Sequence, residues 1–463
     1  MNERKVSLEE FLTVLDKAEN GPVVGLKEWD NVYIYAKIKE LVEQYDLSFP
    51  VDEPGVPSDD DLADRLFAAA IQLCVDSGVY CTDTNRRMIW TEEEIQGVLD
   101  RAPAMLTAGA GEGTFVINKR LPDSTGKVPF GGGPWGVVIP EEYFLQLNKA
   151  YVKESLFDFF TTGALKTVRG RPVRAGSPWD TTACWHEVRM TMQAIEEAGR
   201  PGMAVCAPNT SASAIGTVSV QSYGGMRLTD WQNASFMSEL KVPYEDLIRT
   251  SHFIETNSFV HNFYNPIYGG FAGGAEGTAI ATVAGFILMK ATLFGDSFNT
   301  GISHAHLSFN TFPALIVSQA VAMQALSRNS NICIANFTRP AAGPTEMDMM
   351  YEIAAYQLST VTSGVWVGQG VQTVTGRFEG HCSPLEARFA AEVAHAAGGM
   401  SRAEAHPIVN KLIEMYKDEQ TLLKKGKAFN ECYDLETLEP TAEWQAVYEK
   451  AREVMIKMGI PLE

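Results

Sequence analysis

The stretch GRPGMAVCAPNTS, residues 199–211, is typical of a buried strand that runs directly into a polar loop. Its apolar run GMAVCA ends beside a single cysteine, Cys206, and a Pro-Asn-Thr-Ser loop follows. Similar runs recur along the chain, each followed by a loop rich in Gly, Pro or Asn and then by a longer helical pattern. Strands that alternate with helices indicate a parallel sheet. The predicted strands are 113–118, 158–165, 202–207, 258–263, 299–306, 331–337 and 364–371.

About seven or eight such units in roughly 300 residues favour an α/β fold of the closed (β/α)8 TIM-barrel type. An open sheet is disfavoured because no dinucleotide-binding glycine fingerprint follows a first strand. We predict an N-terminal helical layer over residues 1–105, on the helical spacing of segments 32–45 and 59–78. The barrel is expected over 106–400, and a C-terminal helical extension over 401–463.

Composition narrows the class of partner. The chain has 463 residues and a net charge of −19, which repels phosphate backbones and anionic lipid surfaces. The longest apolar run, 279–295, is interrupted by Lys290 and is too short for a membrane span. Seven scattered cysteines without a C-x-x-C pair suit a reducing compartment. We therefore expect a cytoplasmic protein that binds neither nucleic acid nor membrane.

The ends of the predicted strands carry the candidate site residues. In TIM barrels the active site is built at the C-terminal ends of the strands, so residues there are expected to meet at one mouth. The candidates at or just beyond such ends are Cys206, Phe263, His304, His306, Phe337 and Arg339.

Each candidate also has a structural interpretation. Cys206 is either an apolar filler or a thiolate that a nearby histidine or helix N-terminus would activate. His304 and His306, two apart on a predicted strand, would share a face, as a metal pair requires. Only Cys333 and His381 are candidates for further metal ligands. We therefore predict no metal and expect the two histidines to form hydrogen bonds with polar groups of the barrel. A metal-dependent barrel hydrolase stays an alternative.

Three glycine-rich loops match neither the phosphate-binding nor the dinucleotide-binding spacing. They are FGGGPWG (130–136), YGGFAGGAEGT (268–278) and AAGPTEM (341–347). Glycine lets a backbone come close to a neighbour, so these loops predict close approach of a large planar ligand or a docking protein.

Several sequence blocks keep a common order over nearly the whole chain: SGVYCTDTNR (77–86), VRGRPV (168–173), AGRPGMAV (198–205), ELK (239–241), PIYGGFAGG (266–274), AGPTEM (342–347), LEAR (385–388) and FNECYDLETLEPT (429–441). With these blocks the chain resembles the corrinoid-dependent monomethylamine methyltransferase family. The resemblance implies a (β/α)8 barrel in a homo-oligomer, a hexamer by analogy. It also implies methyl transfer from a methylamine to the cobalt of a cognate corrinoid protein, with no tightly bound cofactor on this chain.

The site positions depart from the family pattern. The position of Cys206 holds pyrrolysine in that family, and a thiol cannot form the adduct of the pyrroline imine. The family's two active-site glutamates fall on Asn233 and Phe263, and its glutamine and tyrosine on Phe337 and Arg339. The resemblance therefore implies a relative without pyrrolysine and with a remodelled pocket.

These replacements suggest a different methyl donor. A quaternary ammonium leaves as a neutral amine and needs no electrophilic residue, and aromatic faces bind it by cation–π attraction. Phe263 and Phe337, with Tyr264, Tyr223 or Trp231, could form such a cage. The guanidinium of Arg339 suits a carboxylate, so the cage and Arg339 together point to a betaine. The alternative is that Arg339 pairs with Glu346 and binds no ligand. Open alternatives are monomethylamine or another N-, S- or O-methyl donor, and a non-catalytic paralogue that binds the corrinoid protein.

Overall fold

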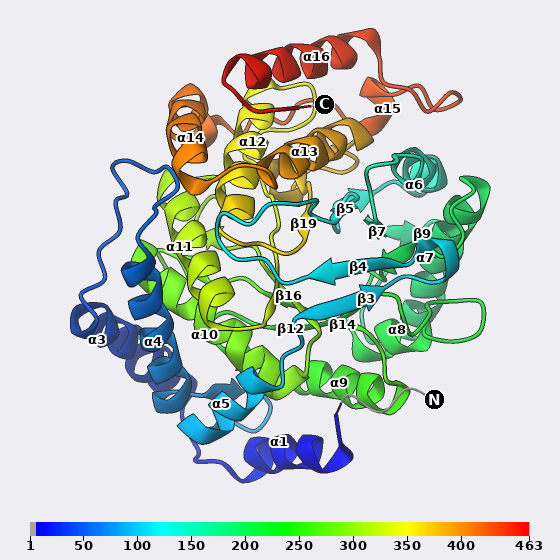
Figure 1. Ribbon diagram of the computed structural model, residues 1–463. Helices are drawn as coiled ribbons and strands as arrows, with labels where there is room; N and C mark the ends of the chain where they lie inside the picture. The colour runs from blue at the N-terminus through cyan, green and yellow to red at the C-terminus, as the bar shows by residue number, and fades with distance from the viewer. Residues whose placement is uncertain (1–5, 463) are drawn as a thin grey trace.

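The computed structural model describes residues 6–462, and eight parallel strands in it close into a barrel (Figure 1). Two four-stranded sheets, β19-β5-β7-β11 in one and β12-β14-β16-β18 in the other, are joined by parallel bridges. The bridges pair Cys206 with Trp231 and Ala335 with Val367. The predicted TIM barrel is thereby confirmed. The strands are β5 (Phe130–Gly132), β7 (Phe159–Thr161), β11 (Ala204–Cys206), β12 (Gln232–Phe236), β14 (Val260–Tyr264), β16 (Ser297–Thr300), β18 (Cys333–Ala335) and β19 (Gly368–Gln369).

A helix follows each barrel strand and covers its outer face (Figure 1). In chain order these are α6 (Phe144–Val152), α7 (Pro178–Glu197), α8 (Ala214–Ser219), α9 (Tyr244–Thr256), α10 (Ala275–Leu293), α11 (Pro313–Asn329), α12 (Met347–Thr362) and α13 (Pro384–Ala397). Short strands and helical turns decorate the loops at β6 (Val138–Ile139), β8 (Ala164–Leu165), β9 (Thr167–Val168), β10 (Arg171–Pro172), β13 (Lys241–Val242), β15 (Ile267–Tyr268), β17 (Ser303–His304), η3 (Glu141–Tyr143) and η4 (Thr373–Gly376).

Residues 113–118 differ from the prediction of a barrel strand. Strand β4 (Phe115–Asn118) pairs antiparallel with β3 (Met105–Ala108), and η2 (Gly111–Gly113) lies in the turn between them. The Phe115 ring stacks on Phe159 and Trp231, with centroids 5.9 and 6.5 Å apart. Both partners lie where barrel strands begin, so the hairpin closes the N-terminal end of the barrel. The prediction was wrong because an apolar run does not reveal which sheet it joins.

The N-terminal layer holds helices α1 (Leu8–Asn20), α2 (Leu26–Glu28), the π-helical η1 (Trp29–Ala36), α3 (Lys37–Gln44), α4 (Asp60–Asp76) and α5 (Glu92–Asp100), with strands β1 (Val79–Cys81) and β2 (Arg86–Met88). Helix α4 begins where the Asp59 side chain accepts a hydrogen bond from Leu62 N at 3.0 Å, a standard N-cap. Its apolar face packs on α10 and α11. The chain thus adds a helical layer outside one side of the barrel (Figure 1).

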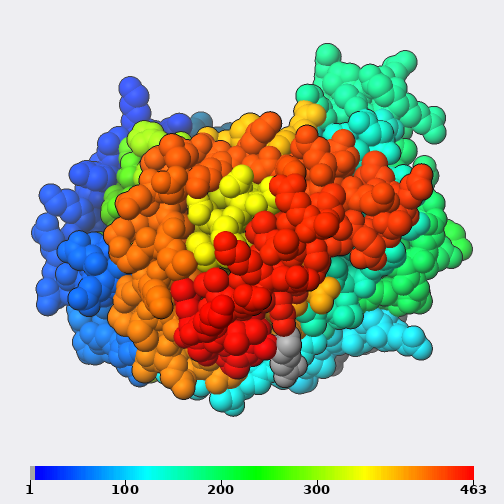
Figure 2. Space-filling view, turned by 90° about the horizontal axis from the view of Figure 1, so that it is seen from above, coloured from blue at the N-terminus to red at the C-terminus, as the bar shows by residue number. Residues whose placement is uncertain are grey.

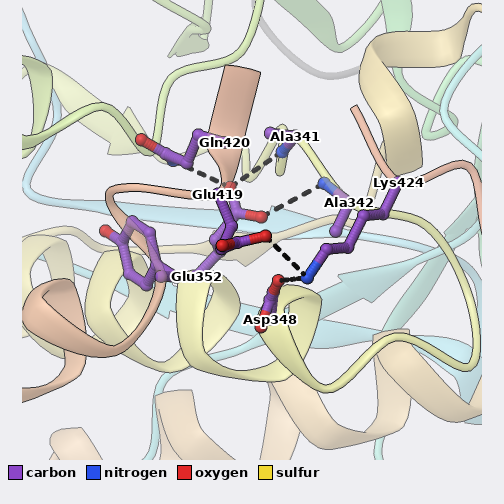
Figure 3. Close-up of a pocket in the computed structure, with 8 residues that line it drawn as sticks. Ala341, Ala342, Asp348, Glu352, Glu419, Gln420 and Lys424 are labelled. Atoms are coloured by element: carbon purple, nitrogen blue, oxygen red, sulfur yellow. Dashed lines mark hydrogen bonds and ion pairs between the residues drawn. The ribbon is translucent and has the colours of Figure 1, made fainter. Parts of the chain in front are cut away.

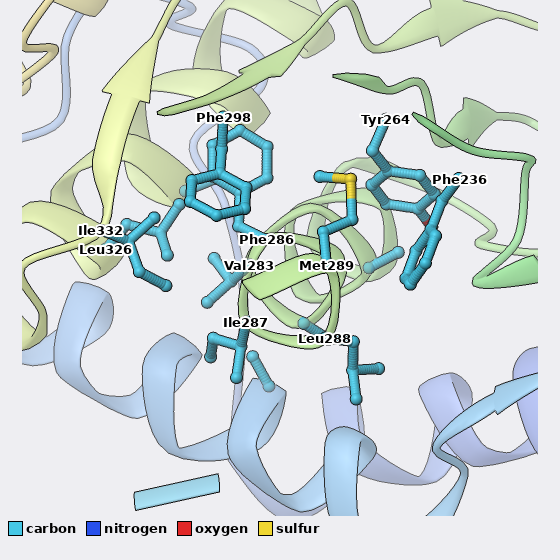
Figure 4. Packing of buried hydrophobic residues seen from close by; sticks show 14 of the residues in the cluster. Phe236, Tyr264, Val283, Phe286, Ile287, Leu288, Met289, Phe298, Leu326 and Ile332 are labelled. Carbon is cyan, nitrogen blue, oxygen red and sulfur yellow. The ribbon is translucent and has the colours of Figure 1, made fainter. Parts of the chain in front are cut away.

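Helix α10 carries apolar residues around its whole circumference because it is packed between the barrel strands and the N-terminal helices. By length and composition alone it could cross a membrane, but 89% of that window is buried inside the molecule. Figure 4 shows Phe298 and Tyr264 of the barrel on one side of it and Ile287 and Leu288 turned toward the N-terminal helices. A helix enclosed on all sides needs no polar face.

The C-terminal extension comprises α14 (Arg402–Tyr416), η5 (Gln420–Leu422), α15 (Phe429–Cys432) and α16 (Ala442–Lys457). Helix α14 packs on α12, and α16 packs on α12 and α13. Figure 2 shows these orange and red segments lying over the yellow α12. The domain boundaries at residues 105 and 400 stay predictions.

A buried carboxylate fastens this extension to the barrel loops (Figure 3). Glu352 of α12 accepts hydrogen bonds from Ala341 N at 2.8 Å, Ala342 N at 3.1 Å and Gln420 Nε2 at 3.0 Å. Lys424 Nζ pairs with Asp348 at 2.5 Å beside it. The joint links α12, the loop after β18 and the segment around Gln420. We call it the C-terminal clasp.

Candidate active site at the barrel mouth

A cavity of about 650 Å³ opens at the C-terminal ends of the barrel strands. Its exposed outer lining includes Ala212 and Glu245. The inner lining comes from six strands or their loops: Trp135 after β5, Asn209 after β11, Asn233 of β12, Phe263 of β14, Phe337 and Arg339 after β18, and Gln372 after β19. The cavity therefore lies where the barrel architecture places active sites.

Cys206 ends strand β11 and lies beneath the cavity floor. Its side chain is fully buried, and Sγ donates to Asn233 Oδ1 at 3.2 Å. Burial raises the pKa of the Cys206 thiol to about 12, so the neutral thiol is the form present at neutral pH. The cysteine fills space and bonds its neighbour, and it is not an activated nucleophile.

The loop after Cys206 is held by one buried acid. Glu187 of α7 accepts from the backbone N–H groups of Asn209 and Thr210, each at 2.8 Å, and from the Thr162 hydroxyl. Burial raises the pKa of the Glu187 carboxyl, although the hydrogen bonds oppose that effect. The Asn209 amide donates back to Thr162 Oγ1 at 2.9 Å. These bonds fix the loop at this side of the mouth.

Three aromatic rings form one continuous wall of the cavity. The centroids of Trp135 and Phe337 lie 5.1 Å apart, those of Trp135 and Phe263 6.2 Å, and those of Phe263 and Phe337 6.4 Å. The backbone carbonyl of Trp135 accepts from Gln372 Nε2 at 2.7 Å, which ties the backbone at Trp135 to the loop after β19. Sequence reasoning found the two phenylalanines and missed the tryptophan. We call these three residues the aromatic wall.

The other aromatic candidates lie elsewhere, which corrects the predicted cage. Side chains alternate along a strand, so Phe263 faces the barrel interior while Tyr264 points outward to Glu239 and α10. Trp231 stacks on Phe159 at 4.1 Å near the closed end of the barrel. Tyr223 is fully exposed.

Arg339 stands beside the aromatic wall without an acidic partner. Its Nη1 donates to Ser303 Oγ at 2.6 Å, and its backbone N–H to Asn310 Oδ1 at 2.8 Å. Among residues 6–462 no ion pair joins Arg339 to a carboxylate, Glu346 included, and its buried Nε has no hydrogen-bond partner. Burial lowers the pKa of the guanidinium to about 10, which leaves it protonated at neutral pH.

The two histidines do not join this site. His304 ends the short β17, while His306 lies exposed in the following turn, so they do not share a strand face and that prediction was wrong. Their rings lie 6.1 Å apart, and neither lines the cavity. His304 packs against Phe312 instead. Within the described part of the chain no group of three or more His, Cys, Asp or Glu residues could hold a metal ion.

The glycines before Trp135 were predicted to allow the close approach of a planar ligand or a docking protein. In the structure they lie against side chains and backbone of the neighbouring strand instead. A methyl group on Gly131 would lie 2.1 Å from the Phe159 ring, and one on Gly132 2.3 Å from the Phe157 ring. Gly133 adopts a φ of +143° against the Thr161 carbonyl. The run brings strand β5 close to its neighbours and turns the chain so that Trp135 faces the mouth.

A family model, monomethylamine methyltransferase MtmB, matches residues 10–460. The chain belongs to the MtmB family. A relative named monomethylamine methyltransferase MtmB2, from Methanosarcina acetivorans, is 33% identical over 451 residues, covering 96% of this chain and 97% of the relative. Another MtmB2, from Methanosarcina barkeri, is 32% identical over 448 residues, with the same coverage.

Solved structures agree with this membership. The crystal structure of the Methanosarcina barkeri monomethylamine methyltransferase superposes with a TM-score of 0.94 at 30% identity, over 98% of this chain and all of the other. A hydroxylamine complex of MtmB gives the same values. The predicted family and the barrel are both confirmed, and this chain is an MtmB-family methyltransferase.

Proposed function

We propose that this MtmB-family protein transfers a methyl group from a quaternary ammonium compound, a betaine, to the Co(I) of a corrinoid protein. The observation that carries the proposal is the aromatic wall standing directly beside the unpaired Arg339. Each ring that faces a cation contributes about 0.5–2 kcal/mol of attraction. A guanidinium without an internal acid suits a carboxylate. One zwitterion satisfies both.

Cys206 supports a donor that needs no activation. A primary amine is a poor leaving group unless it is protonated or captured, and the neutral, buried thiol has no electrophilic atom for that task. In a quaternary ammonium the nitrogen already bears the positive charge. When its C–N bond breaks, the electron pair stays on nitrogen and a neutral tertiary amine departs.

The proposed acceptor is a corrinoid that a partner protein would present at the open mouth. The corrinoid supplies the Co(I) nucleophile that accepts the methyl group. This chain's residues bind the ammonium against the aromatic wall, hold the carboxylate at Arg339 and keep the methyl directed outward. The exposed lining at Ala212 and Glu245 leaves the cavity open to a partner. Asn233 lines the cavity and is a candidate binding residue, whereas the predicted candidates His304 and His306 lie outside the cavity lining. A cytoplasmic homo-oligomer completes the proposal.

The test is a methyl-transfer assay with free Co(I) cobalamin or the partner corrinoid protein. The donors are monomethylamine, dimethylamine, trimethylamine, choline and several betaines, and methylcobalamin formation is recorded. We expect the highest kcat/KM for a betaine and no measurable methylcobalamin formation from monomethylamine. Monomethylamine as the best donor would overturn the proposal, and transfer from no donor would favour a non-catalytic paralogue.

Variants of the aromatic wall show whether it binds the cation. Phe337→Leu keeps much of the volume and removes the quadrupole, so a quaternary donor should lose about 1 kcal/mol, roughly fivefold in kcat/KM. Trp135→Leu should act in the same direction. Tyr264→Leu, on the same sheet but outside the cavity, is the matched control for general loss of packing. Equal losses for a neutral methyl donor and for a betaine would argue against a cation site.

A further inference from the structure

Gly301 follows strand β16 at the point where the aromatic wall meets Arg339. A methyl group on Gly301 would lie 2.9 Å from Phe337 Cδ1, 3.0 Å from Asn265 Oδ1 and 3.3 Å from Arg339 Cδ. These three side chains therefore close around the missing Cβ. Phe337 Cδ1 and Arg339 Cδ lie no more than about 6 Å apart as a result. The Phe337 ring and the aliphatic part of the Arg339 side chain are therefore close neighbours.

The backbone around this contact is fixed. Asn310 accepts from Arg339 N at 2.8 Å and donates from Nδ2 to the Phe337 carbonyl at 2.6 Å. The hydroxyl of Tyr356 accepts from Phe337 N at 3.2 Å. Because the backbone is held at both residues, the points from which the ring and the guanidinium side chain project are fixed before a ligand arrives, which lowers the entropy cost of binding.

The hydrogen bonds of the guanidinium are made by Nη1. Nη1 donates to Ser303 Oγ at 2.6 Å and to the Gly301 carbonyl at 3.5 Å, and the Ser303 hydroxyl donates to that same carbonyl at 2.9 Å. The buried Nε has no partner. The Nε–Nη2 edge matches a carboxylate with two parallel hydrogen bonds.

Asn265 completes the polar part of the contact. Its Oδ1 accepts from Gly301 N at 2.8 Å, so the group that it can offer a ligand in the cavity is its NH2. A carboxylate at Arg339 would then have donors on two sides, with the Phe337 ring against the neighbouring carbon.

We infer that the substrate is a compact betaine in which one carbon separates the quaternary nitrogen from the carboxylate, and that Gly301 determines this spacing. The inference rests on the proposed function for the methyl transfer but concerns binding alone. A longer zwitterion would have to fold back, or leave either the ring or the free guanidinium edge without its partner. An amine without a carboxylate would leave the buried guanidinium unpaired.

The test measures dissociation constants by calorimetry, without any corrinoid. The probes are glycine betaine, its homologues with two and three carbons between nitrogen and carboxylate, and choline. We expect glycine betaine to bind at least tenfold more tightly than the three-carbon homologue and than choline. Arg339→Lys, which keeps the charge and loses the fork, should weaken glycine betaine at least tenfold and choline less than threefold. Equal affinities across the series would overturn the inference.

Gly301→Ala tests the spacing itself. The added methyl group presses on Phe337 and Arg339, so the preference for glycine betaine over the three-carbon homologue should fall at least fivefold. A ratio of affinities does not change when a variant merely loses folded protein. Gly274→Ala, on another mouth loop with only an ordinary contact at 3.7 Å, should leave the ratio unchanged. An unchanged ratio in Gly301→Ala would assign the spacing to other residues.

The binding result and the transfer result can fail separately. Tight, length-dependent binding of betaines without methyl transfer would refute the proposed function and leave the spacing inference standing. Preferential methyl transfer from betaines, with equal affinities for betaines of every chain length, would refute the spacing inference and leave the proposed function standing.

Discussion

At the scale of single residues, Cys206 illustrates how burial decides chemistry. The sequence leaves a filler and a thiolate as equal possibilities, because it shows neither burial nor neighbours. In the structure Sγ faces Asn233 and no histidine, and the pKa of the thiol rises to about 12. Only a very small fraction of this thiol is ionised at neutral pH, so covalent catalysis by it is disfavoured.

We therefore predict that Cys206→Ser retains kcat/KM within about tenfold of the wild type on its best donor. Removal of a true nucleophile lowers the rate by about 10⁴-fold or more. A serine hydroxyl also donates to Asn233, so the fold is expected to persist. Cys333→Ser, at a buried cysteine remote from the cavity lining, is the control for a polar atom in the core. A 10⁴-fold loss confined to Cys206→Ser would show that the thiol takes part in the reaction.

The same scale shows where sequence reasoning stops. Phe263, Phe337 and Arg339 could be found because they follow recognisable strands. Trp135 could not, since β5 reads FGG and has no apolar pattern. The glycines before Trp135 mark this strand in the sequence. They are needed because the Phe157 and Phe159 rings lie close to the backbone there, which the sequence does not show. Whether Arg339 has an acidic partner depends on side-chain placement across loops, which sequence does not show.

At the scale of secondary-structure elements, the strands that sequence missed are the least apolar. Strand β12 reads QNASF and alternates buried with half-buried residues, yet its polar side chains conceal it. It pairs in parallel with β14 and carries Asn233 into the cavity. Inside a barrel, polar side chains can bond one another, so hydrophobicity alone underestimates such strands.

Helix α10 offers a test of how closely elements pack. A methyl group on Gly285 would lie 2.3 Å from Tyr264 Cδ1 on the adjoining strand β14. Gly→Ala inside an exposed helix stabilises by about 1 kcal/mol, but overpacking costs about 1–3 kcal/mol. We predict a lower melting temperature for Gly285→Ala. The control is Gly97→Ala in α5, where the nearest atom is the flexible end of Arg101, and its melting temperature should not fall. A more stable Gly285→Ala would disprove the tight contact.

The C-terminal clasp makes stability depend on pH in a defined direction. Burial raises the pKa of Glu352 to about 7, above the roughly 4.3 of an unfolded glutamate. Between these values the folded state binds more protons, so the Glu352 contribution to stability falls as pH rises from about 4.5 to 7. Glu352→Gln removes this dependence. The free energy of unfolding in urea should be lower for Glu352→Gln than for the wild type at about pH 4.5. This difference should shrink by up to about 3 kcal/mol as the pH rises to about 7.

A surface glutamate provides the comparison. The pKa of Glu197 is lowered by its hydrogen bond to Lys149, so its pH dependence lies below the ordinary value. The stability difference between Glu197→Gln and the wild type should stay constant from pH 5 to 7.5. A Glu352→Gln deficit that grows with pH would mean that the hydrogen bonds from Ala341, Ala342 and Gln420 outweigh burial.

At the scale of the whole molecule, sequence reasoning recovered the barrel and its helical additions and missed how they are joined. Periodicity locates helices such as 60–76 and 402–416, but the clasp connects residues 352 and 420. Long-range pairs of this kind leave no periodic pattern. Residues 113–118 were wrongly assigned to the barrel for the same reason. They pair with β3 in a hairpin and contact the barrel only by the stacking of Phe115 on Phe159 and Trp231.

The proposal that this MtmB-family chain takes a quaternary donor in place of monomethylamine concerns the whole site. The most direct measurement is a competition in one vessel, with equal concentrations of glycine betaine and monomethylamine, Co(I) cobalamin and the enzyme. Dimethylglycine and ammonia are quantified against the methylcobalamin formed. The account predicts dimethylglycine in equal amount to methylcobalamin and no ammonia. Ammonia in equal amount to methylcobalamin, without dimethylglycine, would contradict it.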